Sequence, residues 1–190
     1  MSIGNVSLVV GSLVPGLSLG VEHLGAGLLD EGGRGERIEI TATRDGVKVP
    51  LRCESEGIKK LVGILNLLID VYGRPGACVV VDELDSGIFE FLLGEILAVL
   101  QQKGKGQLVF TAHNLRPLET LDKGSLVFTT TNPEHRYTTF KGVKASNNLR
   151  SLYLRAIDLG GQPEVIYEST SPYEIDSAFY EAGLTAVEDR

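Results

Sequence analysis

The chain has 190 residues, of which 43% are hydrophobic and 23% are charged, and its formal net charge at pH 7 is −7. A chain of this length can bury one core, so we expect a single domain, and its acidity disfavours direct binding of nucleic acid by this chain alone. No apolar stretch is as long as a membrane span, and the two cysteines lack metal-ligand spacing and favour a reducing compartment. We therefore expect a cytoplasmic protein without a membrane partner.

The N-terminal part of the chain (1–52) is predicted to be rich in β-structure. Polar and apolar residues alternate over 37–43, and Asp45-Gly46, a strong signal for a tight turn, precedes the stretch 47–51. These features predict an antiparallel hairpin, with a glycine-rich loop at 31–35 before it.

The pattern changes in the middle part of the chain (53–160). Apolar residues recur at helical spacing from 58 to 72, and Ser55 can cap this helix. Strands and helices are then predicted in alternation: a buried strand at 77–82, a helix at 87–102, a strand at 107–111, a short helical connection and a third strand at 125–131. This alternation indicates an α/β fold with a mainly parallel sheet whose faces are covered by helices.

The end of the chain carries weaker signals. We predict a helix at 147–157, capped by Asn147 or Asn148, and a second helix at 172–183. Residues 161–190 are treated as a C-terminal extension of the same domain.

Two adjacent carboxylates, Asp82 and Glu83, end the predicted strand "ACVVVDE". Ligands bind at the carboxyl edge of the sheet in open α/β folds, where one carboxylate can hold Mg²⁺ while its neighbour polarises a water molecule. A purely structural interpretation is also open, because Asp85 and Ser86 would cap a helix that begins at Gly87.

Two further features bear on this choice. The next predicted strand, "QLVFTA", ends on His113, which could bind a phosphate oxygen or the water that Glu83 holds, or could simply flank the short helix that follows. Upstream, "ESEGIKKL" places Ser55 and Gly57 at a helix N-terminus, where free N–H groups can bind an anion, although the same residues describe an ordinary capped helix.

Taken in order, "SEGIKK", "VVVDELDSG" and "FTAHN" resemble the C-terminal half of an ABC-type ATPase head, over about residues 37–160. More narrowly, the chain resembles the AAA-family ATPases akin to SMC, double-strand-break-repair and overcoming-lysogenization-defect proteins. The resemblance implies roles for six residues. Ser55 and Gly57 would contact the γ-phosphate of ATP held by the opposite subunit, Asp82 would bind Mg²⁺, Glu83 would be the catalytic base, Asp85 would touch the facing protomer, and His113 would be the switch histidine.

The chain departs from this family in one respect, because a nucleotide site of this kind needs a P-loop, GxxxxGK[ST]. The segment from Gly11 to Ser18 has the glycine spacing, but Leu17 stands where the lysine is required and Pro15 removes an N–H group. We interpret "VPGLSL" as a turn that enters a strand, and we find no Walker A motif.

Three explanations follow for a lobe of this kind without a P-loop. The chain is the C-terminal lobe of a larger or split ATPase that is completed by a P-loop lobe, it is a non-catalytic interaction or regulatory module derived from such a lobe, or it binds another phosphorylated ligand at the helix that Ser55 leads. ATP and Mg²⁺ are expected only with the completing lobe. Since an absent P-loop strand would leave the strand at 77–82 without a neighbour, we expect a homodimer, an N-terminal segment folded into the gap, or a protein partner.

Overall fold

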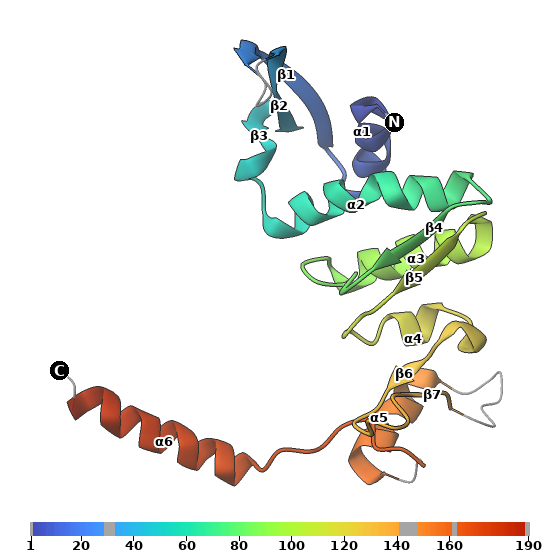
Figure 1. Ribbon diagram of the computed structural model, residues 1–190, viewed down its shortest axis with the longest axis vertical. Coiled ribbons are helices and arrows are strands. Elements are labelled where there is room, and N and C mark those ends of the chain that lie inside the picture. Colours follow the sequence, from blue (N-terminus) through green and yellow to red (C-terminus); the bar gives the residue numbers. More distant parts are fainter. Residues whose placement is uncertain (1, 29–32, 141–147, 161–162, 189–190) are drawn as a thin grey trace. The chain divides into compact units, whose positions relative to one another are not determined.

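The computed structural model describes residues 2–28, 33–140, 148–160 and 163–188. The chain divides into two compact units, Met1–Leu121 and Asp122–Arg190. Both helices and small sheets occur, which confirms the mixed α/β class (Figure 1). The arrangement as one domain with internal boundaries at 52 and 160 stays a prediction.

The first unit begins with a helix and a three-stranded antiparallel sheet in the order β1-β2-β3. These elements are α1 (Ile3–Leu13), β1 (Leu17–Leu28), β2 (Arg34–Arg44) and β3 (Val47–Pro50). The predicted hairpin is confirmed: Arg44 pairs with Val47, and Asp45 and Gly46 between them have φ of 49° and 79°, as a tight hairpin turn requires. In the predicted loop at 31–35, residues 31 and 32 lie outside the described residues, whereas Arg34 and Gly35 already belong to β2.

The rest of this unit alternates helices with short strands. Its elements are the 3₁₀ turn η1 (Leu51–Cys53), α2 (Glu56–Gly73), β4 (Cys78–Val81), α3 (Glu90–Lys103), β5 (Gln107–Phe110) and α4 (Pro117–Thr120). Ser55 caps α2 as predicted, because its Oγ accepts a hydrogen bond from the Ile58 N–H at 3.4 Å. The helix predicted at 87–102 begins three residues later, at Glu90, and its N-cap, Phe89, makes no side-chain cap.

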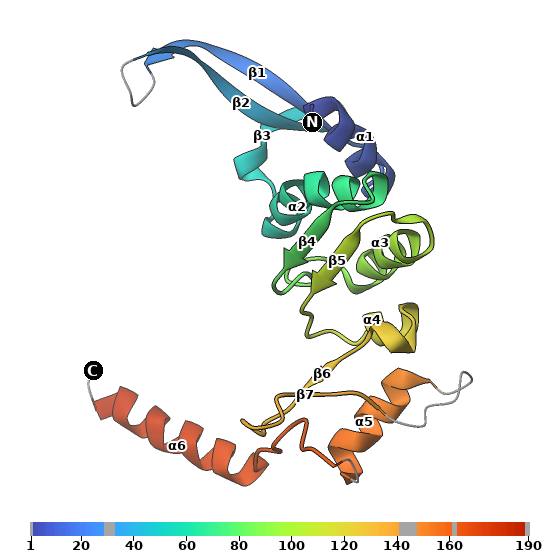
Figure 2. The ribbon, with the colours of Figure 1, turned by 45° about the vertical axis from the view of Figure 1, so that its right-hand side comes forward.

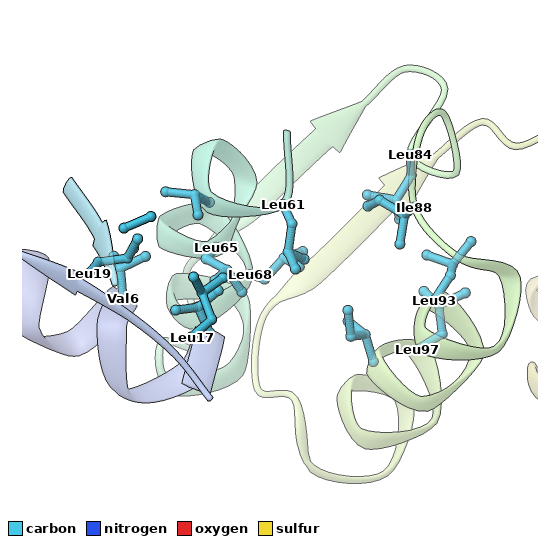
Figure 3. Close-up of a cluster of buried hydrophobic side chains, with 14 residues drawn as sticks. Val6, Leu17, Leu19, Leu61, Leu65, Leu68, Leu84, Ile88, Leu93 and Leu97 are labelled. Atoms are coloured by element: carbon cyan, nitrogen blue, oxygen red, sulfur yellow. The ribbon is translucent and has the colours of Figure 1, made fainter. Parts of the chain in front are cut away.

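One hydrophobic core joins these elements. Figure 3 shows Val6, Leu17 and Leu19, from α1 and β1, beside side chains of α2, and a second group at α3 and the loop before it. The residues labelled on α2, that loop and α3 are Leu61, Leu65, Leu68, Leu84, Ile88, Leu93 and Leu97. Leu84 is only 1% exposed although it lies in the loop directly after Glu83, so packing anchors the loop that carries the predicted site.

The β4–β5 pair is parallel, but the larger parallel sheet that we predicted is not what the structure shows. β4 and β5 form a two-stranded sheet, and among the described residues no N-terminal strand pairs with either of them. Val81 and Phe110 pack against the core, whereas Val80 is 74% and Val109 47% exposed. The prediction of a strand buried on both faces is therefore wrong for these residues, since one face of the pair is open.

The second unit contains η2 (Lys123–Ser125), β6 (Phe128–Thr129), β7 (Tyr137–Thr138), α5 (Leu149–Leu159) and α6 (Pro172–Glu188). The third parallel strand predicted at 125–131 is wrong, because only two of its residues are in a strand and they pair antiparallel with β7. Both predicted helices are present. Asn148 caps α5 by accepting a hydrogen bond from the Ser151 N–H at 3.1 Å, whereas Asn147 lies outside the described residues.

Within the described ranges, no helix has both the length and the hydropathy that a membrane span requires.

Candidate functional site

The parallel register of β4 and β5 brings the two predicted motifs together. Cys78 pairs with Gln107 and Val81 with Phe110, so each residue of β4 lies opposite the residue 29 positions later. Figure 2 shows the two strands side by side, running in the same direction. The residues that follow the strands, Asp82 and Thr111, therefore meet at the same edge of the sheet.

Thr111 links both carboxylate residues through one hydroxyl group. Its O–H donates a hydrogen bond to Asp82 Oδ1, and the same oxygen accepts one from the Glu83 N–H at 2.7 Å. The backbone continues the pairing, because the Thr111 N–H donates to the Val81 carbonyl at 3.1 Å and the Leu84 N–H donates to the Thr111 carbonyl at 2.9 Å. The end of β5 thus fixes the turn that begins at Asp82.

Glu83 has an unusual backbone conformation. Its φ is 47°, in the left-handed region that residues with a long side chain seldom adopt. Its carbonyl oxygen accepts hydrogen bonds from Lys60 Nζ and from the Ser86 N–H, the latter at 3.0 Å. Conformations of this kind cost about 1–3 kcal/mol and cluster at functional sites. The Glu83 side chain is 57% exposed.

The predicted catalytic pair, Glu83 and His113, lies together. The His113 Nε2 atom is 3.9 Å from Glu83 Oε1, and the His113 side chain is 85% exposed. Both side chains are largely exposed at the carboxyl edge of β4 and β5, so a base and an imidazole lie side by side there within reach of solvent.

Asp85 does not cap the following helix, so the purely structural interpretation of this residue is wrong. Its Oδ2 atom accepts hydrogen bonds from the backbone N–H groups of His113, at 3.0 Å, and Asn114, at 2.8 Å. Oδ1 is buried and has no hydrogen-bond partner among the described residues. Asp85 thereby ties the loop after β4 to the loop that carries His113.

The N-terminus of α2 faces the same loop. A Cβ atom added at Gly57 would lie 2.1 Å from the Gly87 carbonyl oxygen, and Gly87 itself has φ of 73°. Two glycines are needed here because the two backbones touch. Gly57 is half-buried and covered by the chain's own backbone, while Ser55 is exposed.

The segment that resembles a P-loop in spacing folds otherwise. Gly11 lies in α1, Gly16 forms a turn with φ of 84°, and Ser18 is already in β1. This is the turn into a strand that we predicted. A Cβ at Gly11 would lie 3.2 Å from the Leu17 carbonyl oxygen, so that space is occupied by backbone.

Sequence reasoning missed three residues of this site: Lys60, Gly87 and Thr111. The register of the structure brings Asp82 to Thr111, whereas strands starting at 77 and 107, as predicted, would have brought Asp82 to Ala112. Lys60 and Gly87 gave no sequence signal, because their contacts depend on how α2 packs beside the loop.

Comparisons with known proteins bear on the fold. No protein-family model and no curated protein matches the chain. A solved structure from work on ATP-driven dimerization and DNA-stimulated activation of SMC ATPases matches with a TM-score of 0.56 and 15% identity, and covers 80% of this chain and 88% of that chain.

Two further solved structures have TM-scores of 0.45 and 19% identity. One is an Smc head bound to the C-terminal winged-helix domain of ScpA, aligned over 60% of this chain and 35% of its own. The other, from Pyrococcus furiosus, is an Smc head with an extended coiled coil bound to the C-terminal domain of ScpA, aligned over 62% of this chain and 30% of its own. At 15% identity the first match concerns the fold alone, and this chain shares the fold of a solved SMC ATPase structure.

Proposed function

We propose that this chain is an ATPase lobe of the ABC/AAA type, which contributes to Mg²⁺-ATP binding and hydrolysis when a P-loop lobe completes it. One observation carries the proposal: Asp82, Glu83 and His113 come from two separate segments and converge at the carboxyl edge of one parallel strand pair. The shared fold with an SMC ATPase structure supports it.

Each residue has a chemical role in this proposal. Glu83 is the general base that accepts a proton from the attacking water, and His113, 3.9 Å away, binds the γ-phosphate or helps to hold that water. Ser55, exposed at the N-terminus of α2, is proposed to contact the γ-phosphate of ATP held by a facing subunit. Asp85 is proposed to lie at the surface that contacts the facing subunit.

The oxygen atoms at this edge fit a magnesium ion. Mg²⁺ in nucleotide sites takes one or two carboxylates together with phosphate oxygens and water, and Asp82 offers an exposed carboxylate with one oxygen held by Thr111. No cluster of three or more acidic, histidine or cysteine ligands occurs among the described residues, so the protein would not hold the ion without phosphates. When bound, the ion neutralises charge that develops on the phosphate oxygens.

The need for a completing lobe has its own support. Val80 and Val109 project from the same open face of the β4–β5 pair, although parallel strands normally have both faces covered. The outer part of the β1–β2 ribbon also exposes Ile38 (57%) and Val21 (37%). A second lobe that covers these apolar side chains would bury them and would supply the missing P-loop.

The proposal is tested first by calorimetric titration of the purified chain with Mg²⁺-ATP, and then by repeating the titration and an ATPase assay with a polypeptide that carries GxxxxGK[ST] added. We expect no binding to the chain alone and hydrolysis by the pair. Glu83→Gln should lower kcat at least 100-fold while nucleotide stays bound, because general-base catalysis contributes about 10²–10⁴-fold.

The matched control is Glu95→Gln, a solvent-exposed glutamate in α3, which should leave kcat unchanged. Hydrolysis that survives Glu83→Gln would contradict the assigned base. Tight binding of Mg²⁺-ATP to the chain alone would contradict the need for a second lobe.

One observation favours a second candidate function, a non-catalytic interaction module derived from such a lobe. The Gly57 backbone is covered by the Gly87 carbonyl, so Gly57 is not open to a phosphate in this arrangement. This candidate predicts that the chain still binds its partner after Glu83→Gln and that the complex has no ATPase activity in either form.

A further inference from the structure

The peptide group on each side of Glu83 is held by side chains from two other elements. On the N-terminal side, the Glu83 N–H donates to Thr111 Oγ1 at 2.7 Å. On the C-terminal side, the Glu83 carbonyl accepts from Lys60 Nζ, which comes from α2. The residue between these contacts has φ of 47°, so it is held in a conformation that its own side chain disfavours.

The hydroxyl of Thr111 suits this position because it both donates and accepts. It donates to Asp82 Oδ1 while it accepts from the Glu83 N–H, so one oxygen atom binds both the Asp82 side chain and the Glu83 backbone. Serine could make both bonds, whereas valine, which has the same shape, could make neither.

Lys60 adds a contact from a different direction. The Glu83 carbonyl also accepts from the Ser86 N–H at 3.0 Å, a bond that belongs to the turn itself. The Lys60 ammonium is a charged donor, and hydrogen bonds with charged donors are about twice as strong as neutral ones. Its neighbour Lys59 instead pairs with Glu56 on the surface of the same helix, at 2.5 Å.

We propose that Thr111 and Lys60 are positioning residues that hold Glu83 in its left-handed conformation and thereby direct its carboxylate toward His113. Without them the backbone would relax toward negative φ, which rotates the Glu83 side chain away from its place 3.9 Å from His113 Nε2. We call the two contacts, Thr111 to the Glu83 N–H and Lys60 to the Glu83 carbonyl, the clamp. The use of the Glu83 carboxylate in hydrolysis rests on the proposed function, whereas the clamp itself does not.

The clamp can be tested on the purified chain without nucleotide. Glycine adopts positive φ freely and alanine does not, so Glu83→Gly should be more stable than Glu83→Ala by about 5- to 30-fold in the unfolding equilibrium constant. We call this factor, the unfolding equilibrium constant of the alanine variant divided by that of the glycine variant, the glycine-to-alanine ratio. We expect the same ratio when Thr111→Ser is also present. With Thr111→Val or Lys60→Met the ratio should fall close to one, because a relaxed turn no longer needs glycine.

Lys59→Met is the matched control and should leave the ratio unchanged. Amide hydrogen exchange gives an independent readout: the residue 83 amide should stay protected in Thr111→Ser and exchange at least tenfold faster in Thr111→Val, since its acceptor is lost. A glycine-to-alanine ratio that is the same in Thr111→Val, Lys60→Met and the parent chain would overturn the clamp. If the clamp holds but no completed pair hydrolyses ATP, only the proposed function fails.

Discussion

Replacing Gly57 by alanine should force the loop after β4 away from α2. The added Cβ would lie 2.1 Å from the Gly87 carbonyl oxygen, whereas ordinary contacts begin near 3.4 Å, so the two backbones must separate by about 1.3 Å. Gly87, with φ of 73°, cannot adjust by side-chain movement because it has none. The loop that must move carries Leu84 and Ile88, which are 1% and 8% exposed in the core.

The expected change in the free energy of unfolding follows from two opposing effects. Overpacking of a well-packed region costs about 1–3 kcal/mol, and the better helix propensity of alanine returns at most about 1 kcal/mol. We expect Gly57→Ala to lower the free energy of unfolding by about 1–2 kcal/mol. Gly63, in the same helix, has nothing within 4 Å of an added Cβ, so Gly63→Ala should raise stability by about 0.5–1 kcal/mol.

Urea denaturation followed by circular dichroism measures both variants against the parent chain. The decisive result is whether the free energy of unfolding of Gly57→Ala lies below that of the parent chain while that of Gly63→Ala lies above it. If Gly57→Ala were as stable as Gly63→Ala, the contact between Gly57 and Gly87 would not hold in solution, and α2 would have an N-terminus open to a ligand.

Two further predictions concern other parts of the chain. Thr41 is 2% exposed and its Oγ1 has no hydrogen-bond partner among the described residues, so Thr41→Val should leave the Tm unchanged or raise it; a clear fall would show that the hydroxyl has a partner, such as a buried water. The pKa of Glu164 is lowered, first by the hydrogen bond from Asn132 at 2.8 Å and then by that from His135 at 2.7 Å. A depressed pKa means that this stabilisation is present above the usual glutamate pKa of about 4.3 and is lost as the pH falls through the lower folded value. Denaturation of the second unit should therefore become less pH-dependent below pH 5 in Glu164→Gln, and an unchanged acid dependence would contradict the assignment.

The local features of this chain could be predicted from its sequence. Ser55 before an apolar period, Asp45-Gly46 between alternating stretches and Asn148 before a helix each act through hydrogen bonds or backbone angles within a few residues. The same holds for the strand ends that place Asp82 and His113 near one edge. α1 was not predicted, because it has no side-chain cap and no charged first turn, and its stability comes from Val6 and Val10 in the core.

Contacts between distant segments were decided only by the tertiary structure. Asp85 has the sequence context of a helix cap, but its carboxylate accepts hydrogen bonds from the backbone N–H groups after β5. Residues 125–131 have the composition of a parallel strand, yet they meet β7 rather than β5. The sequence by itself determined which residues are candidates for the proposed site, since that depends on residue type and spacing. Only the packing of α2 and β5 around Glu83 decided how its carboxylate is held, because those contacts join residues 23 and 28 positions apart.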